Sequence, residues 1–148
     1  MKTLCALLLL CFMSATVFAA GDAWKTNLDE AKKIAEKENK VILMDFSGSD
    51  WCGWCIKLEK EVFATQAFKD FAKENLVLML VDFPRRKQID PATKTANGSL
   101  AKKYNVEGFP TVILMDSKGN VIAQTGYRAG GAQAYISHLK ELMAKNKK

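Results

Sequence analysis

The amino-acid sequence predicts an α/β fold, with a central mixed β-sheet and helices on both of its faces. Two continuous apolar runs, at 41–46 and 76–82, are typical of strands covered on both sides, and helical patterns precede, separate and follow them. A strand, a helix and a second strand in this order favour a parallel crossover. Two further short strands are joined by a turn at 117–120, which indicates an antiparallel pair.

The first helix is expected to begin at Thr26 or Asn27, either of which can cap it, and to end near Glu38. Its apolar residues recur at helical spacing and are Leu28, Ala31, Ile34 and Ala35. The strand at 41–46 follows. Asp45 is the single ionisable residue of that strand.

The segment 47–50, Ser-Gly-Ser-Asp, contains residues that end a strand. A helix is predicted over about 52–63, so that both cysteines of this region lie in its first turn. Thr65 can cap a continuation of the helix, and the strand at 76–82 comes next.

The second half of the chain begins with a long polar connection at 83–98, which is longer than most loops of a compact domain. A short helix is expected at 99–105, followed by strands at 111–115 and 121–124. The last helix has one apolar face, made of Tyr135, Ile136, Leu139, Leu142 and Met143.

Residues 1–19 have the pattern of a cleaved secretory signal peptide. Lys2 precedes an apolar run at 4–13, and Val17 and Ala19 offer side chains that suit a signal peptidase. We expect cleavage after Ala19. The remaining residues, 20–148, are enough for one domain with its own core and too few for two ordinary ones.

The predicted location is therefore outside the cytoplasm, with the bacterial periplasm favoured. Secretion from the cell and anchoring by an uncleaved leader are the alternatives. A lipid anchor at Cys11 is disfavoured because the preceding Leu10 is bulky.

The chain carries a formal net charge of +6, which becomes +5 once Lys2 has left with the leader. The basic residues are dispersed, and no aromatic residues are interleaved with them as in nucleic-acid-binding segments. We therefore expect no nucleic-acid partner.

Loss of the leader also removes Cys5 and Cys11, so that Cys52 and Cys55 are the only cysteines of the expected mature chain. A structural disulfide is disfavoured, since closing so short a loop stabilises by only about 2 kcal/mol. A closed zinc site needs four ligands, and His138 is the single histidine available. Copper(I) accepts two thiolates, so a copper site stays open beside a redox-active pair.

A redox pair fits the predicted placement best. A thiol at a helix N-terminus is stabilised as the thiolate, which makes Cys52 the expected nucleophile. Cys55, one turn later, is expected to be more buried and to resolve a mixed disulfide. Asp45 can take the proton from Cys55, or can merely anchor the following loop. Phe109-Pro110 is a candidate cis peptide bond.

The sequence WCGWC after a buried strand that ends in Asp-Phe, with GFPT some distance later, resembles the thioredoxin superfamily. The resemblance covers nearly all of the expected mature chain. The sequence DWCGWC followed by LEKEVF is also similar to the C-terminal periplasmic domain of DsbD, a thiol:disulfide interchange protein. The resemblance implies a thioredoxin fold in which Cys52 attacks, Cys55 resolves, Asp45 assists and Pro110 is cis. It further implies a substrate groove, whose expected members are Trp51, Gly53, Trp54, Phe109, Pro110 and Gly126.

This sequence also departs from thioredoxin. The dipeptide between the cysteines is Gly53-Trp54 in place of Gly-Pro, and Asp45 stands one residue further from the first cysteine. The lysine that thioredoxin has near this carboxylate is expected to be replaced by Leu78 or Met79. Trp54 has two possible roles: to select partners or to shield Cys55 from water.

We therefore expect a monomeric, exported thiol-disulfide oxidoreductase that exchanges disulfides with protein substrates, needs no bound cofactor or metal, and is recharged by a redox partner. The reductase direction is slightly favoured because no histidine lies between Cys52 and Cys55 to stabilise a thiolate strongly. The alternative is a non-catalytic binding module, such as a copper(I) carrier using the same two cysteines.

Overall fold

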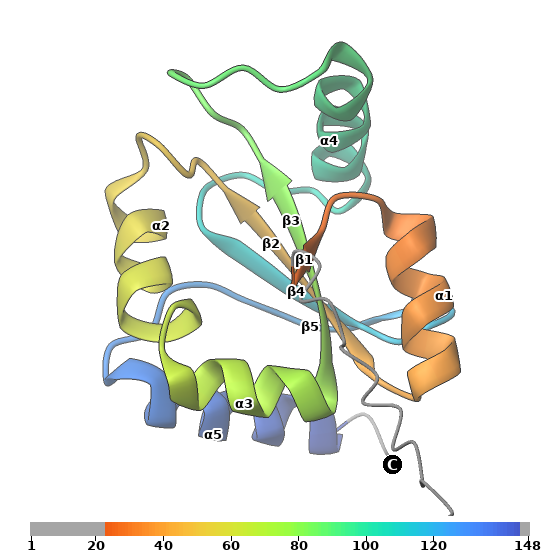
Figure 1. Cartoon of the computed structure of the whole chain (residues 1–148), viewed down its shortest axis with the longest axis vertical. Coiled ribbons are helices and arrows are strands. Elements are labelled where there is room, and N and C mark those ends of the chain that lie inside the picture. The colour runs from red at the N-terminus through yellow and green to blue at the C-terminus, as the bar shows by residue number, and fades with distance from the viewer. Residues whose placement is uncertain (1–22, 146–148) are drawn as a thin grey trace, which may run out of the picture.

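The computed structural model describes residues 23–145, which contain a five-stranded sheet in the order β1-β3-β2-β4-β5 (Figure 1). The strands are β1 (Trp24–Lys25), β2 (Val41–Ser47), β3 (Leu76–Asp82), β4 (Thr111–Met115) and β5 (Val121–Thr125). β3 pairs in parallel with β1 and β2, whereas β4 is antiparallel to both β2 and β5. The predicted mixed sheet and its four main strands are confirmed, and β1 was not predicted.

Helices cover both faces of the sheet (Figure 1). They are α1 (Leu28–Glu38), α2 (Gly53–Leu58), the π-helical turn η1 (Glu59–Phe63), α3 (Gln66–Asn75), α4 (Pro91–Lys103) and α5 (Gly131–Lys145). α1 and α4 lie on one face, and α2, α3 and α5 on the other. The predicted helix over 52–63 is thus present, with its last turn widened to π-helical hydrogen bonding: the Ala64 N–H donates to the Glu59 carbonyl at 2.8 Å.

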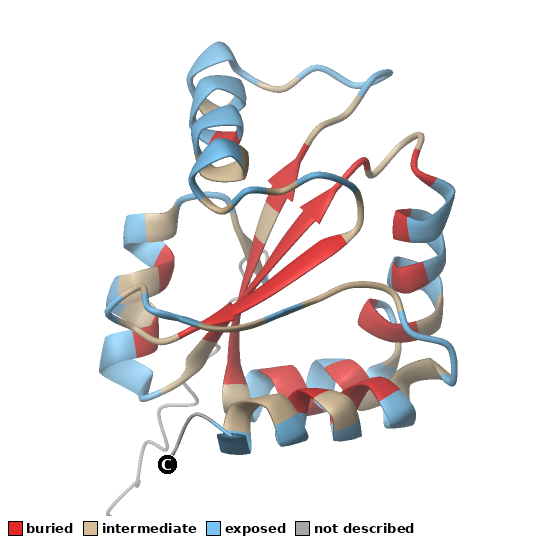
Figure 2. Ribbon diagram, turned by 180° about the vertical axis from the view of Figure 1, so that it is seen from behind, coloured by how far each residue is buried: buried red, intermediate tan, exposed pale blue. Residues whose placement is uncertain are grey.

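Each face of the sheet has its own apolar core, and the strands between them are buried (Figure 2). Because side chains alternate along a strand, Ile42, Met44 and Phe46 of β2 face α1. Leu43 faces α2, α3 and α5. Asp45 shares the face of Leu43, so the alternation directs this carboxyl group towards the helices that follow the cysteine pair.

The connection at 83–98 was predicted to be irregular throughout, and this prediction is wrong. α4 begins already at Pro91, and the loop proper is limited to 83–90. Asp90 caps the helix by accepting the Thr93 N–H at 2.9 Å, and a proline in the first helical turn loses no hydrogen bond. The helix predicted at 99–105 is the end of α4, and the earlier turns were missed because they are polar, contain Gly98 and have Asn97 as their only buried residue.

None of the helices within residues 23–145 is both long and apolar enough to cross a bilayer. The signal peptide predicted at 1–19 lies outside the described residues, so it remains a prediction.

Candidate active site

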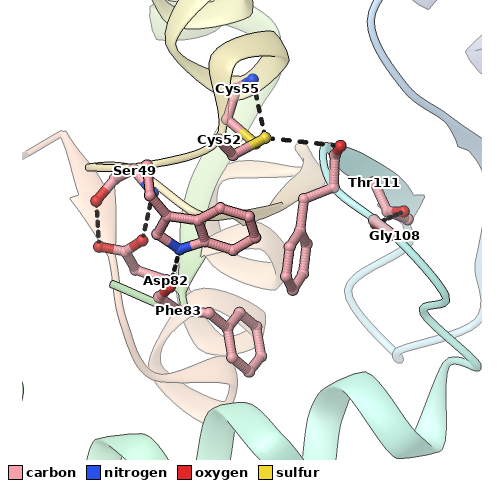
Figure 3. Close-up of a disulfide and its surroundings, with 9 residues drawn as sticks. Ser49, Cys52, Cys55, Asp82, Phe83, Gly108 and Thr111 are labelled. Atoms are coloured by element: carbon pink, nitrogen blue, oxygen red, sulfur yellow. Dashed lines mark hydrogen bonds between the residues drawn. A yellow bond between two sulfur atoms is a disulfide. The ribbon is translucent and has the colours of Figure 1, made fainter. Parts of the chain in front are cut away.

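Cys52 and Cys55 form a disulfide at the N-terminus of α2, with their Cα atoms 5.2 Å apart (Figure 3). Cys52 is the N-cap residue of the helix, and its Sγ accepts the N–H of Cys55 at 3.3 Å. The same sulfur lies 3.6 Å from the carbonyl oxygen of Phe109, where a reduced Cys52 thiol can donate. Cys52 therefore sits between helix N–H groups, which favour a thiolate, and a carbonyl oxygen, which opposes it.

The two cysteines are almost equally buried, with exposed fractions of 7% for Cys52 and 4% for Cys55. Exposure alone therefore does not tell the nucleophile from the resolving cysteine. The two cysteines differ in position, because Cys52 is the N-cap residue of α2 and Cys55 lies within the helix.

Pro110 follows a cis peptide bond, as the resemblance implied. The segment is held by Thr111, whose hydroxyl donates to the Gly108 carbonyl at 2.7 Å (Figure 3). Gly126 lies against this segment: a Cβ atom at position 126 would come within 3.0 Å of the Pro110 carbonyl oxygen. A glycine at 126 thus permits a close backbone approach beside the cysteine pair.

Asp45 lies beneath the pair, in a cavity of about 280 Å³ that Cys55 and Glu59 also line. Its side chain is buried, and its Oδ1 atom has no hydrogen-bond partner within the described part of the chain. Loss of hydration, with smaller contributions from the negative charges of Glu59 and Asp82, raises the pKa of Asp45 to about 8. At neutral pH this carboxyl group is mostly protonated and can give a proton, while the ionised fraction can accept one.

Sequence reasoning did not single out Glu59, which is half-buried and has a raised pKa, again mainly through loss of hydration. Its position four residues after Cys55 places it one helical turn further along the same side of the helix, which is the signal that could have found it. The residue paired with Asp45 on β3 is Leu80. The prediction of Leu78 or Met79 there was one or two residues out of register, although the replacement is apolar as expected.

Trp51 is fixed beside the disulfide by contacts on several sides. Its indole N–H donates to the Phe83 carbonyl at 2.7 Å (Figure 3), and its ring meets that of Phe109 edge-on at 6.0 Å. Gly48 lies under the ring, and a Cβ atom at 48 would come within 2.5 Å of it. The small residue before the cysteines is therefore a packing requirement of Trp51.

Asp82, at the end of β3, anchors the loop before the cysteines. Its carboxylate accepts both the N–H and the hydroxyl of Ser49, at 3.0 and 2.7 Å (Figure 3), and pairs with Lys87 at 2.8 Å. Asp82 was not among the predicted site residues, because nothing in the sequence connects it to Ser49.

Trp54 is 57% exposed on the first turn of α2. Its ring lies 5.1 Å from that of Tyr127, and the Lys57 ammonium group stands 5.2 Å from both ring centres. Tyr127, a residue not predicted, is held by its hydroxyl, which donates to Glu61 at 2.7 Å. Gly53 has open space where a side chain would be.

The structure thus gathers most of the predicted site residues in one region. Cys52, Cys55, Trp51, Phe109 and Pro110 lie around the disulfide, with Asp45 below it. Gly126 abuts Pro110, while Gly53 and Trp54 lie on the outward side of the first helical turn.

A dithiol pair at a helix N-terminus, opposite a cis-proline and above a buried carboxyl group, defines a thiol-disulfide oxidoreductase with a thioredoxin fold. The family model of the thioredoxin-like domain matches residues 28–141, and the chain belongs to this family.

Two groups of relatives agree with this assignment. The chain is 34% identical to the disulfide bond reductase DsbH of Chlamydia pneumoniae over 127 residues, which cover 86% of this chain and 76% of the relative. It is 30% identical over 115 residues to the thiol:disulfide interchange protein DsbD of Actinobacillus pleuropneumoniae. That match covers 75% of this chain and only 18% of DsbD, so the similarity concerns one part of a much longer protein.

Solved structures support the fold. A structure of a DsbH oxidoreductase superposes with a TM-score of 0.77 at 34% identity, covering 82% of this chain and 83% of that one. The oxidised C-terminal domain of DsbD from Neisseria meningitidis gives a TM-score of 0.54 at 20% identity, covering 77% and 88% of the two chains. The predicted thioredoxin fold and the likeness to DsbD are confirmed.

Proposed function

We propose that this protein is an exported reductase of disulfide bonds in other proteins, with Cys52 as nucleophile and Cys55 as resolving cysteine. The observation that carries the proposal is the position of Cys52, which caps α2 with its Sγ on the Cys55 N–H, directly opposite the segment before Pro110. Export rests on the leader pattern at 1–19, and the periplasm of a bacterium is the proposed location.

The reductase direction has two supports. The relative from Chlamydia pneumoniae is named a disulfide bond reductase. In addition, the Phe109 carbonyl oxygen at 3.6 Å from Cys52 Sγ counteracts the stabilisation of a thiolate by the helix N-terminus. A less stabilised thiolate makes the disulfide harder to reduce, and a dithiol of this kind acts as an electron donor to other disulfides.

The exchange takes place in two displacements. The Cys52 thiolate attacks a sulfur of the substrate disulfide, forms a mixed disulfide and expels the first substrate thiolate, which takes a proton from water. Ionised Asp45 then accepts the proton of the Cys55 thiol. The resulting Cys55 thiolate attacks Cys52 Sγ, releases the second substrate thiolate and closes the Cys52–Cys55 disulfide.

Recharging by a thiol-bearing redox partner reverses these steps. The partner thiolate attacks Cys52 Sγ, and Cys55 leaves as a thiolate that is protonated by Asp45. A second thiolate of the partner then attacks the partner sulfur of the mixed disulfide and releases the Cys52 thiolate, which leaves the partner oxidised. With a pKa of about 8, Asp45 still carries that proton in most molecules at neutral pH.

Reduction of insulin by dithiothreitol, followed as turbidity, tests the activity. The wild type should accelerate it strongly and Cys52→Ser should not. A reduction potential measured against glutathione then tests the direction, and a value near that of thioredoxin, about −270 mV, is expected. A value near about −120 mV would reverse the assignment to that of an oxidant.

The same variant tests the copper-carrier alternative, which the named relatives do not favour. If wild type and Cys52→Ser were equally inactive towards insulin while the wild type bound copper(I) one-to-one, the enzymatic proposal would be wrong.

A further inference from the structure

A groove of about 540 Å³ lies between the loop 83–90 and the start of α4. Its rim includes Pro84, Arg85, Lys87, Ile89 and Lys94. The proposed exchange reaction makes no use of this groove, and the sequence identified its loop only as a long polar connection.

The groove is joined to the cysteine pair through Trp51. The Arg85 guanidinium lies 3.7 Å from the centre of the Trp51 ring, on its face, and Trp51 directly precedes Cys52. Phe83, at the inner end of the groove, stacks on Phe109 at 5.0 Å between ring centres. A peptide whose sulfur reaches Cys52 therefore has its neighbouring residues within reach of Arg85.

Asp50 fixes the shape of this loop. Its carboxylate accepts the backbone N–H groups of Arg85, Arg86 and Lys87 at 2.9, 2.7 and 2.9 Å. These hydrogen bonds hold the pKa of Asp50 at about 2, so the carboxylate is ionised at neutral pH. The loop is thus tied to the residue two positions before Cys52.

The charges of the groove are unequal. Asp82 and Lys87 neutralise each other at 2.8 Å, and Asp90 and Asp50 accept backbone N–H groups. Within residues 23–145, by contrast, neither Arg85 nor Lys94 takes part in an ion pair, and both are exposed. The groove therefore presents two cationic groups that are free to meet an anionic partner.

We infer that this groove selects protein substrates whose reactive cysteine is flanked by acidic residues, with Arg85 and Lys94 receiving the carboxylates. This inference rests on the proposed thiol-disulfide exchange and adds a substrate class to it. Arg85 is the nearer of the two groups to the reacting sulfur, because it stacks on Trp51. Lys94, on the first turn of α4, extends the recognition along the groove.

Two synthetic peptides test the inference. Each has one cysteine, activated as a mixed disulfide with 4-thiopyridine, and the flanking residues are glutamates in one peptide and lysines in the other. Reduced protein attacks the peptide sulfur, and the thiopyridone that leaves is measured by absorbance in a stopped-flow instrument. The readout is the ratio of the two second-order rate constants, glutamate peptide over lysine peptide.

The wild type should prefer the glutamate peptide by about tenfold at low salt, and the preference should shrink as salt is added. Arg85→Gln/Lys94→Gln should bring the ratio close to the one measured when the same two activated peptides react with a small thiol. The matched control is Lys33→Gln/Lys118→Gln, which removes the same charge from exposed positions at the opposite end of β2 and should keep the wild-type ratio.

The outcomes separate the two proposals. If neither peptide reacts with the wild type, the exchange function itself is wrong. If both peptides react equally with the wild type, the groove does not select acidic substrates. If the two double variants change the ratio equally, only the net charge of the protein acts and the groove does not select either. A fall in both rates of Arg85→Gln/Lys94→Gln at an unchanged ratio also overturns the inference.

Discussion

Asp45 should make the stability of the oxidised protein depend strongly on pH. An unfolded chain releases this proton near pH 4, whereas the folded protein keeps it up to about pH 8. Between these values the folded state binds one more proton than the unfolded state. The free energy of unfolding therefore falls as pH rises, by about 1.4 kcal/mol per pH unit, or about 3 kcal/mol from pH 5 to pH 7.

Asp45→Asn removes this titration while keeping the size of the side chain. The variant should lose most of the slope and should be more stable than the wild type at neutral pH, because the folded state no longer buries an ionisable group. Glu59 acts in the same direction as Asp45, since its pKa is also raised. His138 acts in the opposite direction and only below about pH 6.5, since its pKa is lowered by burial.

Urea unfolding followed by tryptophan fluorescence, at about pH 5, 6, 7 and 8, measures the slope for wild type, Asp45→Asn and the control Asp70→Asn. Asp70 is an exposed carboxylate in the middle of α3, and its replacement makes the same chemical change away from the cavity. The argument is refuted if Asp45→Asn keeps the wild-type slope, or if Asp70→Asn loses as much of it.

Three further changes test other parts of the site. Glu59→Gln should lower the pKa of Asp45 below about 8 but keep it above the usual range, because loss of hydration is the larger cause; carbon NMR of the carboxyl group measures this, and an unchanged pKa would exclude the contribution of Glu59. Gly48→Ala should destabilise the protein by about 1–3 kcal/mol, since the new Cβ atom would overlap the Trp51 ring, and urea unfolding that matches the wild type would contradict this packing. Asp50→Ala should speed hydrogen exchange of the Arg85, Arg86 and Lys87 amides by roughly tenfold or more, and protection equal to that of the wild type would show that other contacts order the loop.

Most of the sheet could be predicted from the sequence, because its strands are short apolar runs whose burial does not depend on remote details. The side of the sheet on which Asp45 lies could also be predicted. Asp45 is two residues from Leu43, and alternation along β2 places both side chains on the side of α2. β1 was missed because two residues give no periodic pattern. The C-terminal part of α4 was predicted as the helix at 99–105, but its start at Pro91 was missed although Asp90-Pro91 is a common helix start, since the polar residues hid the helical spacing.

The parts of the site that could not be predicted are contacts between distant segments. Nothing in the local sequence connects Arg85 with Trp51, or Asp82 with Ser49, because these contacts exist only once β2 and β3 lie side by side. Glu59 is different, since its spacing of four residues from Cys55 predicts that both lie on the same side of the helix. The chemistry of the cysteine pair was therefore accessible from the sequence, whereas the structure that orients its surroundings was not.

The additional residue between Asp45 and the first cysteine shows how the two kinds of information combine. From the sequence alone, this residue was a departure from thioredoxin whose effect on the cysteine pair could not be predicted. In the structure the turn between β2 and α2 accommodates the additional residue. The N–H groups of Trp51 and Cys52 both donate to the Gly48 carbonyl, at 3.1 and 2.8 Å, and Asp45 still lines the cavity below Cys55. The same turn leaves Asp50 free to hold the backbone of the loop 83–90. The longer turn thus leaves Asp45 and Cys55 in one cavity and also connects the cysteine segment to the loop 83–90.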